Sequence, residues 1–122
     1  MAAVWPARRR SRGDPDAPTP TDDRRDLLTV IAYMRAKPGQ EDRLRTALQS
    51  LVEPTSAEEG YVNYDLHESV EQPGTFFFYE NWESAAHLDA HLQAPHLVEF
   101  ANSMGDLLDE QGLTINRLRR IA

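Results

Sequence analysis

The fold is decided by the stretch FFFYENWESAAHLDAHLQAPHL, which runs from Phe76 to Leu97. Because alternate residues of a strand point to opposite sides of a sheet, the opening run places large rings on both faces. One face would hold Phe76, Phe78, Glu80 and Trp82, and the other would hold Phe77, Tyr79 and Asn81. Ser84 then predicts a helix start, because its hydroxyl can cap free backbone N–H groups. Pro95 interrupts this helix, and the helical period resumes after it.

The segments before this stretch predict a strand, a helix and a second strand. Residues 27–37, LLTVIAYMRAK, are β-branched and apolar, which is typical of a buried strand. After the turn at residues 38–39, apolar residues recur at helical spacing until Pro54 closes the helix. Val62 and Tyr64 then alternate with polar residues, which predicts a half-polar strand.

The segment after Leu97 completes one small domain. Gly112 fits the C′ position that ends a helix, and residues 113–122, LTINRLRRIA, predict the last strand. The element order is therefore β-α-β-β-α-β. This order predicts an α+β, ferredoxin-like fold, in which one antiparallel sheet carries two helices on one face.

Two helices cover only one face of such a sheet, yet both faces carry apolar side chains. The first strand repeats the pattern, with Val30, Ala32 and Met34 on one face and Ile31 and Tyr33 on the other. An uncovered apolar face is an association surface. Since the sequence offers no further strands, we expect a second copy of the chain to cover it. The expectation is a homodimer whose two sheets pack face to face.

Residues 1–26 differ in composition from residues 27–122. They are rich in Pro, Asp, Arg and Thr and cannot bury enough apolar surface to offset their ordering entropy. We expect a disordered tail over 1–26 and a single domain over 27–122. The tail holds six Arg and five Asp and therefore has a charge of +1. Because the net charge of the whole chain is −7, the domain has a charge of −8. Because so acidic a domain repels phosphate backbones, nucleic acid is not an expected partner.

The composition also limits the cellular setting and the chemistry. There is no cysteine, which excludes thiolate nucleophiles and disulfides. No apolar run approaches the roughly 20 residues that span a bilayer. The arginines near the N-terminus are not followed by the apolar segment of a secretory signal. We therefore expect a cytoplasmic protein that does not interact with membranes.

Several short motifs resemble one known family. They are Pro38–Gly39 after the first strand, Gly60 and Tyr64 in the second, Glu80 and Trp82 closing the third, and His91 followed by Pro95–His96. Over about Leu28 to Arg120 the chain resembles the antibiotic biosynthesis monooxygenase (ABM) domain family of the dimeric α+β barrel superfamily. The most similar members are its small quinol monooxygenases.

The resemblance implies an oxygenase that works without metal or flavin. In such enzymes a quinol or anthrone loses a proton, and the resulting anion passes an electron to O₂. The implied partners are a small aromatic substrate and O₂. The fold hosts other functions, so two alternatives stay open: an isomerase of a small metabolite, and a non-catalytic dimer that binds a ligand or serves a stress response. A haem-degrading role is disfavoured, because His91 and Ala32 stand where that branch has Trp and Asn.

The candidate catalytic residues are His91 and Glu80. His91 shares an apolar helix stripe with Leu88 and Leu92, and imidazole suits proton transfer near neutral pH. The alternative is a core histidine with a satisfied partner. Glu80 lies on an apolar face and needs a partner, since burying an unpaired carboxylate is costly. One hypothesis is a hydrogen bond that orients His91; the alternative is an ion pair with Arg35 or with an arginine of the last strand.

Four further residues are candidates for substrate binding, namely Tyr64, Trp82, Phe78 and Asn63. The tyrosine hydroxyl could donate to a substrate oxygen, and the rings could form walls for a flat molecule. For Trp82 the alternative is ordinary core packing. For Asn63, on the polar face of its strand, the alternative is the rim of the dimer interface or solvent.

No cofactor is expected from the sequence. His87, His91 and His96 suggest a metal site, but no acidic residue lies at a ligand spacing, and Pro95 redirects the chain before His96. We therefore expect no metal. The glycine-rich motif of dinucleotide-binding folds is also missing from the sequence, which excludes NAD(P) or FAD binding of that kind.

Overall fold

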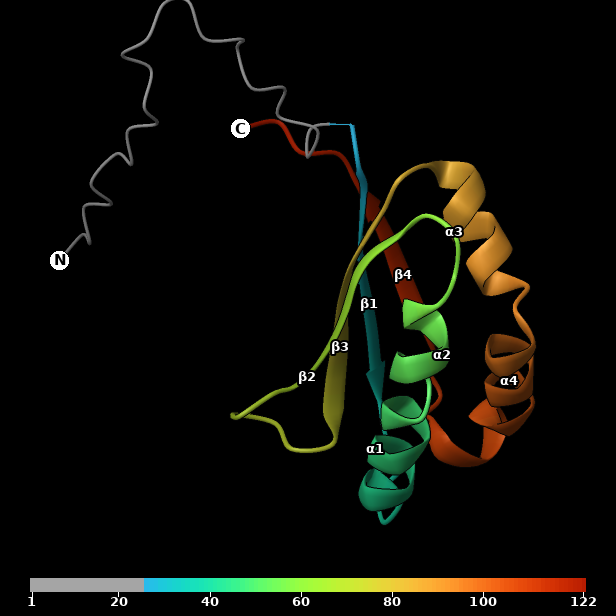
Figure 1. The fold of residues 1–122 in the computed structure, drawn as a ribbon. Coiled ribbons are helices and arrows are strands. Elements are labelled where there is room, and N and C mark those ends of the chain that lie inside the picture. The colour runs from blue at the N-terminus through green and yellow to red at the C-terminus, as the bar shows by residue number, and fades with distance from the viewer. Residues whose placement is uncertain (1–25) are drawn as a thin grey trace, which may run out of the picture.

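A computed structural model describes residues 26–122, which form one antiparallel sheet with all helices on one side (Figure 1). The strand order is β2-β3-β1-β4. The strands are β1 (Leu28–Arg35), β2 (Tyr61–Glu68), β3 (Thr75–Trp82) and β4 (Thr114–Leu118). The predicted α+β, ferredoxin-like arrangement is confirmed. The predicted disorder of residues 1–26 falls, except for Asp26, outside the described part.

Each of the two expected helices is divided into two segments. The helices are α1 (Glu41–Gln49), α2 (Val52–Ser56), α3 (Ala85–Leu92) and α4 (Pro95–Leu107). The expectation that Pro54 ends the first helix is wrong, because Pro54 lies in the first turn of α2. The N–H groups of a first turn have no partner inside the helix, so proline is tolerated there. Pro95 begins α4, as the interruption predicted.

Gly112 does not occupy the predicted C′ position. Helix α4 ends at Leu107, and Leu108 forms an isolated bridge with Ala36. Gly112 comes later, in a turn where its N–H donates to Asp109 O at 3.0 Å. The chain leaves the helix to pair with the sheet before it turns, so the glycine serves the turn and not the helix end.

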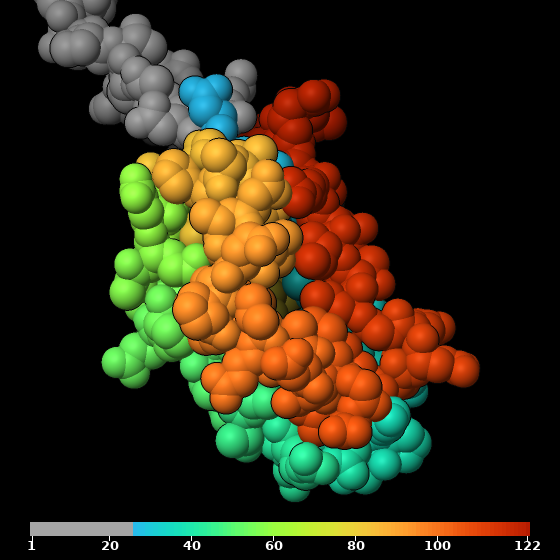
Figure 2. Space-filling view, turned by 90° about the vertical axis from the view of Figure 1, so that its right-hand side faces the viewer, coloured from blue at the N-terminus to red at the C-terminus, as the bar shows by residue number. Residues whose placement is uncertain are grey.

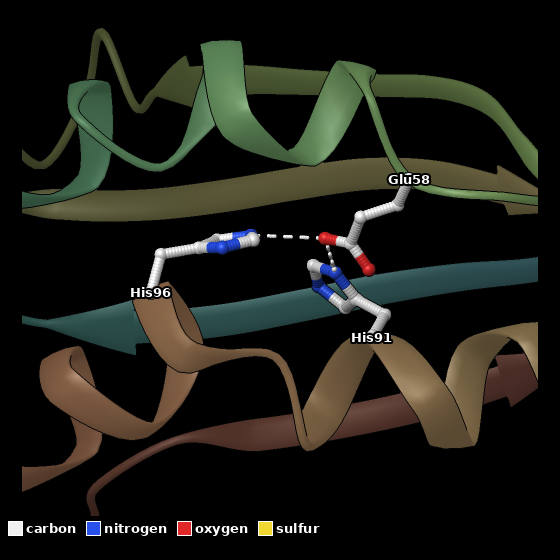
Figure 3. Close-up of side chains that lie close together, drawn as sticks. All are labelled: Glu58, His91 and His96. Carbon is white, nitrogen blue, oxygen red and sulfur yellow. Dashed lines mark hydrogen bonds and ion pairs between the residues drawn. The ribbon is translucent and has the colours of Figure 1, made fainter.

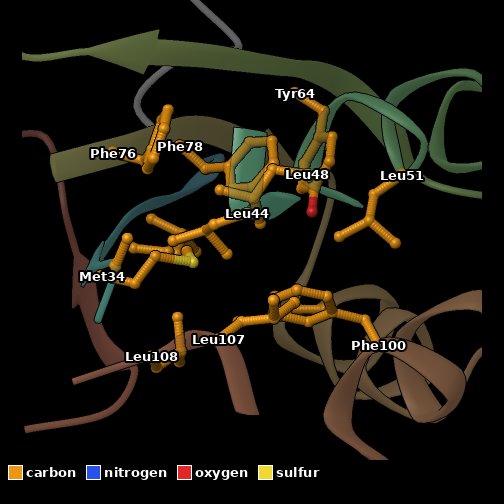
Figure 4. Close-up of a cluster of buried hydrophobic side chains, with 14 of the residues drawn as sticks. Met34, Leu44, Leu48, Leu51, Tyr64, Phe76, Phe78, Phe100, Leu107 and Leu108 are labelled. Atoms are coloured by element: carbon orange, nitrogen blue, oxygen red, sulfur yellow. The ribbon is translucent and has the colours of Figure 1, made fainter. Parts of the chain in front are cut away.

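The two faces of the sheet differ as the alternation predicted. In β3, the side chains of Phe76, Phe78 and Trp82 are buried beneath the helices, and each is at most 2% exposed. They pack with residues of β1 and of the helices in one core cluster, in which Phe78 and Tyr64 lie opposite Phe100 of α4 (Figure 4). Met34 joins the same core from β1.

One side chain of β2 departs from the predicted alternation. The register shifts between Tyr61, which pairs with Trp82, and Asn63, which pairs with Asn81. Val62 is the extra residue of this bulge and is 41% exposed, on the open face and not beside Tyr64 in the core. A bulge places two residues opposite one, which reverses the facing of the residues before it. Tyr61 therefore packs edge-on against the Trp82 ring, at 6.4 Å between centroids.

The start of α3 lies against the loop before β2. Ser84 caps α3, with its hydroxyl accepting from the His87 N–H at 3.2 Å, as predicted. Gly60 has φ +81°, and a Cβ at this position would lie 2.1 Å from His87 Cγ. Only glycine allows this approach of loop and helix. The contact places the residues just before Gly60 beside α3.

The face of the sheet away from the helices is uncovered within residues 26–122. It carries Val62, Tyr79 and Leu118, which are 40–45% exposed, and the ring pair of Tyr33 and Phe77, whose centroids are 5.1 Å apart. A hollow of about 450 Å³ lies on this face, lined in part by Asn63 and Tyr79. In the part of the chain described here, no helix has the length and apolar character needed to cross a membrane.

Candidate active site

Glu58, His91 and His96 meet on the helix side of the sheet, although they come from three different segments (Figure 3). Glu58 precedes β2, His91 lies in α3, and His96 is the second residue of α4. One carboxylate oxygen, Glu58 Oε2, lies 2.8 Å from His91 Nδ1 and 2.9 Å from His96 Nε2. His96 Nε2 also lies 3.1 Å from Thr55 Oγ1. Two imidazoles therefore share one carboxylate oxygen.

Topology explains why these residues meet. Strand β2 begins beside the end of β3, where Tyr61 pairs with Trp82, and α3 follows β3 directly. The loop before β2 must therefore pass the start of α3. The break between α3 and α4 at Pro95 then turns His96 toward the same point.

Burial of His91 favours its neutral imidazole. Burial lowers its pKa from the ordinary value, and the hydrogen bond to Glu58 opposes this only in part. The side chain is 2% exposed. Within residues 26–122, the imidazole makes one hydrogen bond, from Nδ1 to Glu58. If Nδ1–H donates to the carboxylate, the lone pair of Nε2 is free. Glu58 thus fixes both the tautomer and the ring orientation.

Aromatic rings enclose His91. The Trp82 ring lies 4.6 Å from the imidazole and the Tyr64 ring lies 5.2 Å away, edge-on. Tyr64 in turn stacks on Phe78 at 4.2 Å. Burial raises the pKa of the Tyr64 hydroxyl, and the charges of Glu80 and Glu58 raise it further. The hydroxyl therefore stays protonated and can act as a hydrogen-bond donor.

The partner of Glu80 differs from both sequence-based hypotheses. Its Oε1 accepts from Trp82 Nε1–H at 2.9 Å, whereas His91 is oriented by Glu58. Within residues 26–122, Glu80 forms no ion pair with Arg35 or with an arginine of β4. A neutral donor compensates burial only weakly. Burial therefore raises the pKa of Glu80 to about 7, and the nearby charge of Glu58 adds to the effect.

Four of the six predicted site residues line one small cavity, of about 30 Å³, between the sheet and the α3–α4 segment; they are Tyr64, Phe78, Glu80 and His91. Its outer wall includes Leu92, Leu97 and Phe100. In Figure 2 the teal of β1 is visible in a hollow between the orange α3–α4 segment and red β4.

The other two predicted residues lie elsewhere. Trp82 is 0% exposed and packs against His91 without lining the cavity, so its position fits the core-packing alternative. Asn63 faces the open side of the sheet, where its Oδ1 accepts from Asn81 Nδ2 at 2.8 Å and its Nδ2 donates to Tyr79 O at 3.1 Å. It cannot contact a ligand held by His91, because the sheet separates them.

Sequence reasoning missed Glu58 and Thr55, and it considered His96 only as part of a family motif and of a metal site that it did not expect. Glu58 lies 33 residues before His91, so no local spacing connects them. The available signal was topological, because the acidic pair before Gly60 had to lie beside the start of the second helical segment.

Comparison with known proteins identifies the family. The family model described as "Antibiotic biosynthesis monooxygenase" (ABM) matches residues 27–103, more than half of the chain. The chain therefore belongs to the ABM family.

Several relatives are similar along most of the domain. The Escherichia coli K12 protein named "Probable quinol monooxygenase YgiN" is 37% identical, over 68% of this chain and 90% of the relative. The uncharacterised protein sll1783 of Synechocystis is 31% identical, and this chain spans only 56% of its length. The crystal structure of PA3566 from Pseudomonas aeruginosa is 35% identical, with TM-score 0.74 over 80% of this chain and 96% of that chain. Rv0793 from Mycobacterium tuberculosis has TM-score 0.73 at 30% identity.

Proposed function

We propose that this protein is a monooxygenase without cofactor that oxidises a small quinol- or anthrone-like aromatic with O₂, using His91 as general base. The observation that carries the proposal is the arrangement of His91 at the cavity. Its Nδ1 is bound to Glu58, and its Nε2 makes no hydrogen bond within residues 26–122. A buried, oriented and neutral imidazole is suited to taking a proton from a carbon or phenol.

The reaction balances without a further reductant. For an anthrone, His91 removes a proton from the CH₂ carbon, and the resulting anion transfers one electron to O₂. The radical pair combines to a peroxide anion. Loss of water, with the proton returned by His91, leaves a ketone. The CH₂ group gives up four electrons, and O₂ supplies one oxygen atom to the ketone and one to water.

The neighbouring residues support each stage of this chemistry. The Tyr64 hydroxyl, which burial keeps protonated, is a donor for the oxygen that becomes negative when the substrate ionises. The Glu58 carboxylate stabilises the imidazolium that His91 becomes. Phe78, stacked beneath Tyr64, offers an apolar surface to a flat ring.

Substrate entry requires side chains to move. The cavity of about 30 Å³ has room for a water molecule, whereas a cavity of about 150 Å³ holds benzene. The outer wall comes from the two sides of the α3–α4 break, Leu92 before it and Leu97 and Phe100 after it. We infer that this wall swings outward to admit the ring.

We further propose that the open sheet face pairs with a second copy of the chain. Tyr79 is 45% exposed in the middle of that face, beside the half-buried pair of Tyr33 and Phe77. A homodimer would remove these rings from water. Light scattering of the full chain should give twice the mass of the chain; a monomer at all concentrations would contradict the pairing.

Oxygen uptake tests the proposed activity. The chelator-treated protein should consume O₂ above the autoxidation rate on at least one member of a panel of hydroquinones and anthrones. His91→Ala should lower kcat/KM by about 10²–10⁴-fold. His67→Ala, on the open face, is the matched control and should keep full activity. No uptake on any substrate would contradict the oxygenase; uptake unchanged by His91→Ala would contradict the base.

A further inference from the structure

We propose that Glu58, His91 and His96 form a binding site for a divalent first-row transition metal ion. Their ligand atoms all lie within 4.8 Å of one another. Two imidazoles and one carboxylate are donors suited to zinc, iron(II), cobalt(II) and nickel(II). This proposal concerns binding and does not depend on the oxygenase activity proposed above.

The three donors come from three different segments of the fold. His91 is packed between the rings of Trp82 and Tyr64, and the His96 ring lies edge-on to His91, at 6.2 Å between centroids. Both imidazoles direct a nitrogen at the same oxygen of Glu58, as Figure 3 shows. Metal sites depend on such pre-oriented ligands, since the supporting contacts hold the rings in place.

The electrostatic surroundings also favour a cation. Two carboxylates lie near His91: Glu58 bonds to its Nδ1, and Glu80 lines the same small cavity. Within residues 26–122, neither carboxylate forms an ion pair with Lys or Arg. Buried negative charge without a nearby positive partner is costly, and a divalent ion would relieve it.

Metal entry requires the three ligand atoms, which lie within 4.8 Å of one another, to rearrange around the ion. The present nitrogen–oxygen separations of 2.8 and 2.9 Å are hydrogen-bond distances. Around tetrahedral zinc, bonds of about 2.0–2.1 Å place neighbouring ligand atoms roughly 3.3 Å apart. Glu58 and His96 are 16% and 21% exposed, so the side by which an ion enters is open to water. Water would fill the remaining coordination position.

Metal and substrate chemistry would compete for His91. An imidazole bound to metal through Nδ1 carries its proton on Nε2, so it has no lone pair left to act as base. A bound ion should therefore inhibit the proposed oxygenase. This consequence rests on the proposed function, whereas binding is measured in the absence of substrate.

Titration of the chelator-treated full chain with Co²⁺ alone tests the site, because coordinated Co²⁺ absorbs visible light according to its ligands. The expected result is a band that saturates at one ion per chain and is displaced by Zn²⁺. His96→Ala and Glu58→Gln should each weaken binding by at least about 100-fold. Both residues are partly exposed, and circular dichroism would verify that the variants fold.

The other histidines provide matched controls. All four histidines of the sequence are His67, His87, His91 and His96. His67→Ala and His87→Ala should leave the Co²⁺ band and its affinity unchanged. No band in the wild type, or a band that survives in both His96→Ala and Glu58→Gln, would overturn the site. A band lost in His67→Ala would instead show binding to the surface and overturn it equally.

Discussion

The two faces of the sheet are built from the same strands but from different kinds of side chain. The helix-covered face of β3 presents Phe76, Phe78, Glu80 and Trp82, all at most 4% exposed. The open face presents Phe77 and Tyr79, with Asn63 and Asn81 joined by a hydrogen bond of 2.8 Å. Titratable groups with shifted pKa values gather on the covered face, where His91 and Glu80 lie.

This difference indicates that the two faces of the sheet have different roles. Groups buried without full compensation, such as Glu80, reduce stability and are typical of functional sites. The open face has polar groups that are satisfied by each other and rings that are only half covered. Chemistry is therefore expected on the covered face and association on the open one.

The largest expected effect compares two neighbouring phenylalanines. Phe78→Ala removes a ring from the core and should lower the free energy of unfolding by about 3–5 kcal/mol at any protein concentration. Phe77→Ala removes a cross-strand ring pair. In dilute protein this change should lower the free energy of unfolding by only about 1 kcal/mol. Chemical denaturation of both variants provides the measurement.

The dependence of stability on protein concentration then distinguishes a core residue from a residue in a dimer interface. If Phe77 lies in a dimer interface, the decrease in the free energy of unfolding caused by Phe77→Ala should grow as the protein concentration rises. A loss that stays the same over a wide range of concentrations would contradict an interface on the open face.

The next effect concerns the pH dependence of stability. Glu80 has a pKa of about 7 in the folded protein and about 4.5 in the unfolded chain. Between these values the unfolded chain loses the proton first, so the contribution of Glu80 to stability is full below pH 4.5 and is lost as pH rises through 7. The loss amounts to at most about 3 kcal/mol.

Glu80→Gln should remove this dependence. The amide oxygen still accepts from Trp82 Nε1–H but cannot ionise. The stability of the variant relative to wild type should therefore rise between pH 4.5 and pH 8. Thermal or denaturant unfolding at a series of pH values measures it; parallel curves for the two proteins would show that Glu80 is not perturbed by burial.

A smaller effect is expected from the residue that orients His91. Glu58→Gln should lower kcat/KM for oxygen uptake by about 10–100-fold, because the tautomer of His91 is no longer fixed by a carboxylate. The adjacent Glu59 has a side chain that is 94% exposed, so Glu59→Gln is the matched control. Equal kinetics for the two variants would mean that Glu58 has no positioning role.

The sequence predicted the sheet better than it predicted the site. Alternation in β1 and β3 and the cap at Ser84 were strong local signals, and the structure confirms them. Val62 and Pro54 were misjudged, because a bulge and a short second helix depend on packing with other segments. Local patterns carry no information about such contacts.

The site shows the same limit more clearly. Four cavity residues were found because each belongs to an element whose inward face could be recognised; they are His91, Tyr64, Phe78 and Glu80. Glu58 lies in a loop, where no periodicity indicates direction, and only the three-dimensional arrangement brings it to His91. The hydrogen bond to His91, which was one of two hypotheses for Glu80, is made by Glu58 instead.

The most direct test of the account is the protonation state of His91, measured by ¹⁵N NMR of the imidazole in the metal-free protein at neutral pH. The account predicts a neutral ring with the proton on Nδ1 and an unprotonated Nε2, and Glu58→Gln should disturb this state. A proton on Nε2, or an imidazolium at pH 7, would leave His91 without the free lone pair and would contradict its role as the base.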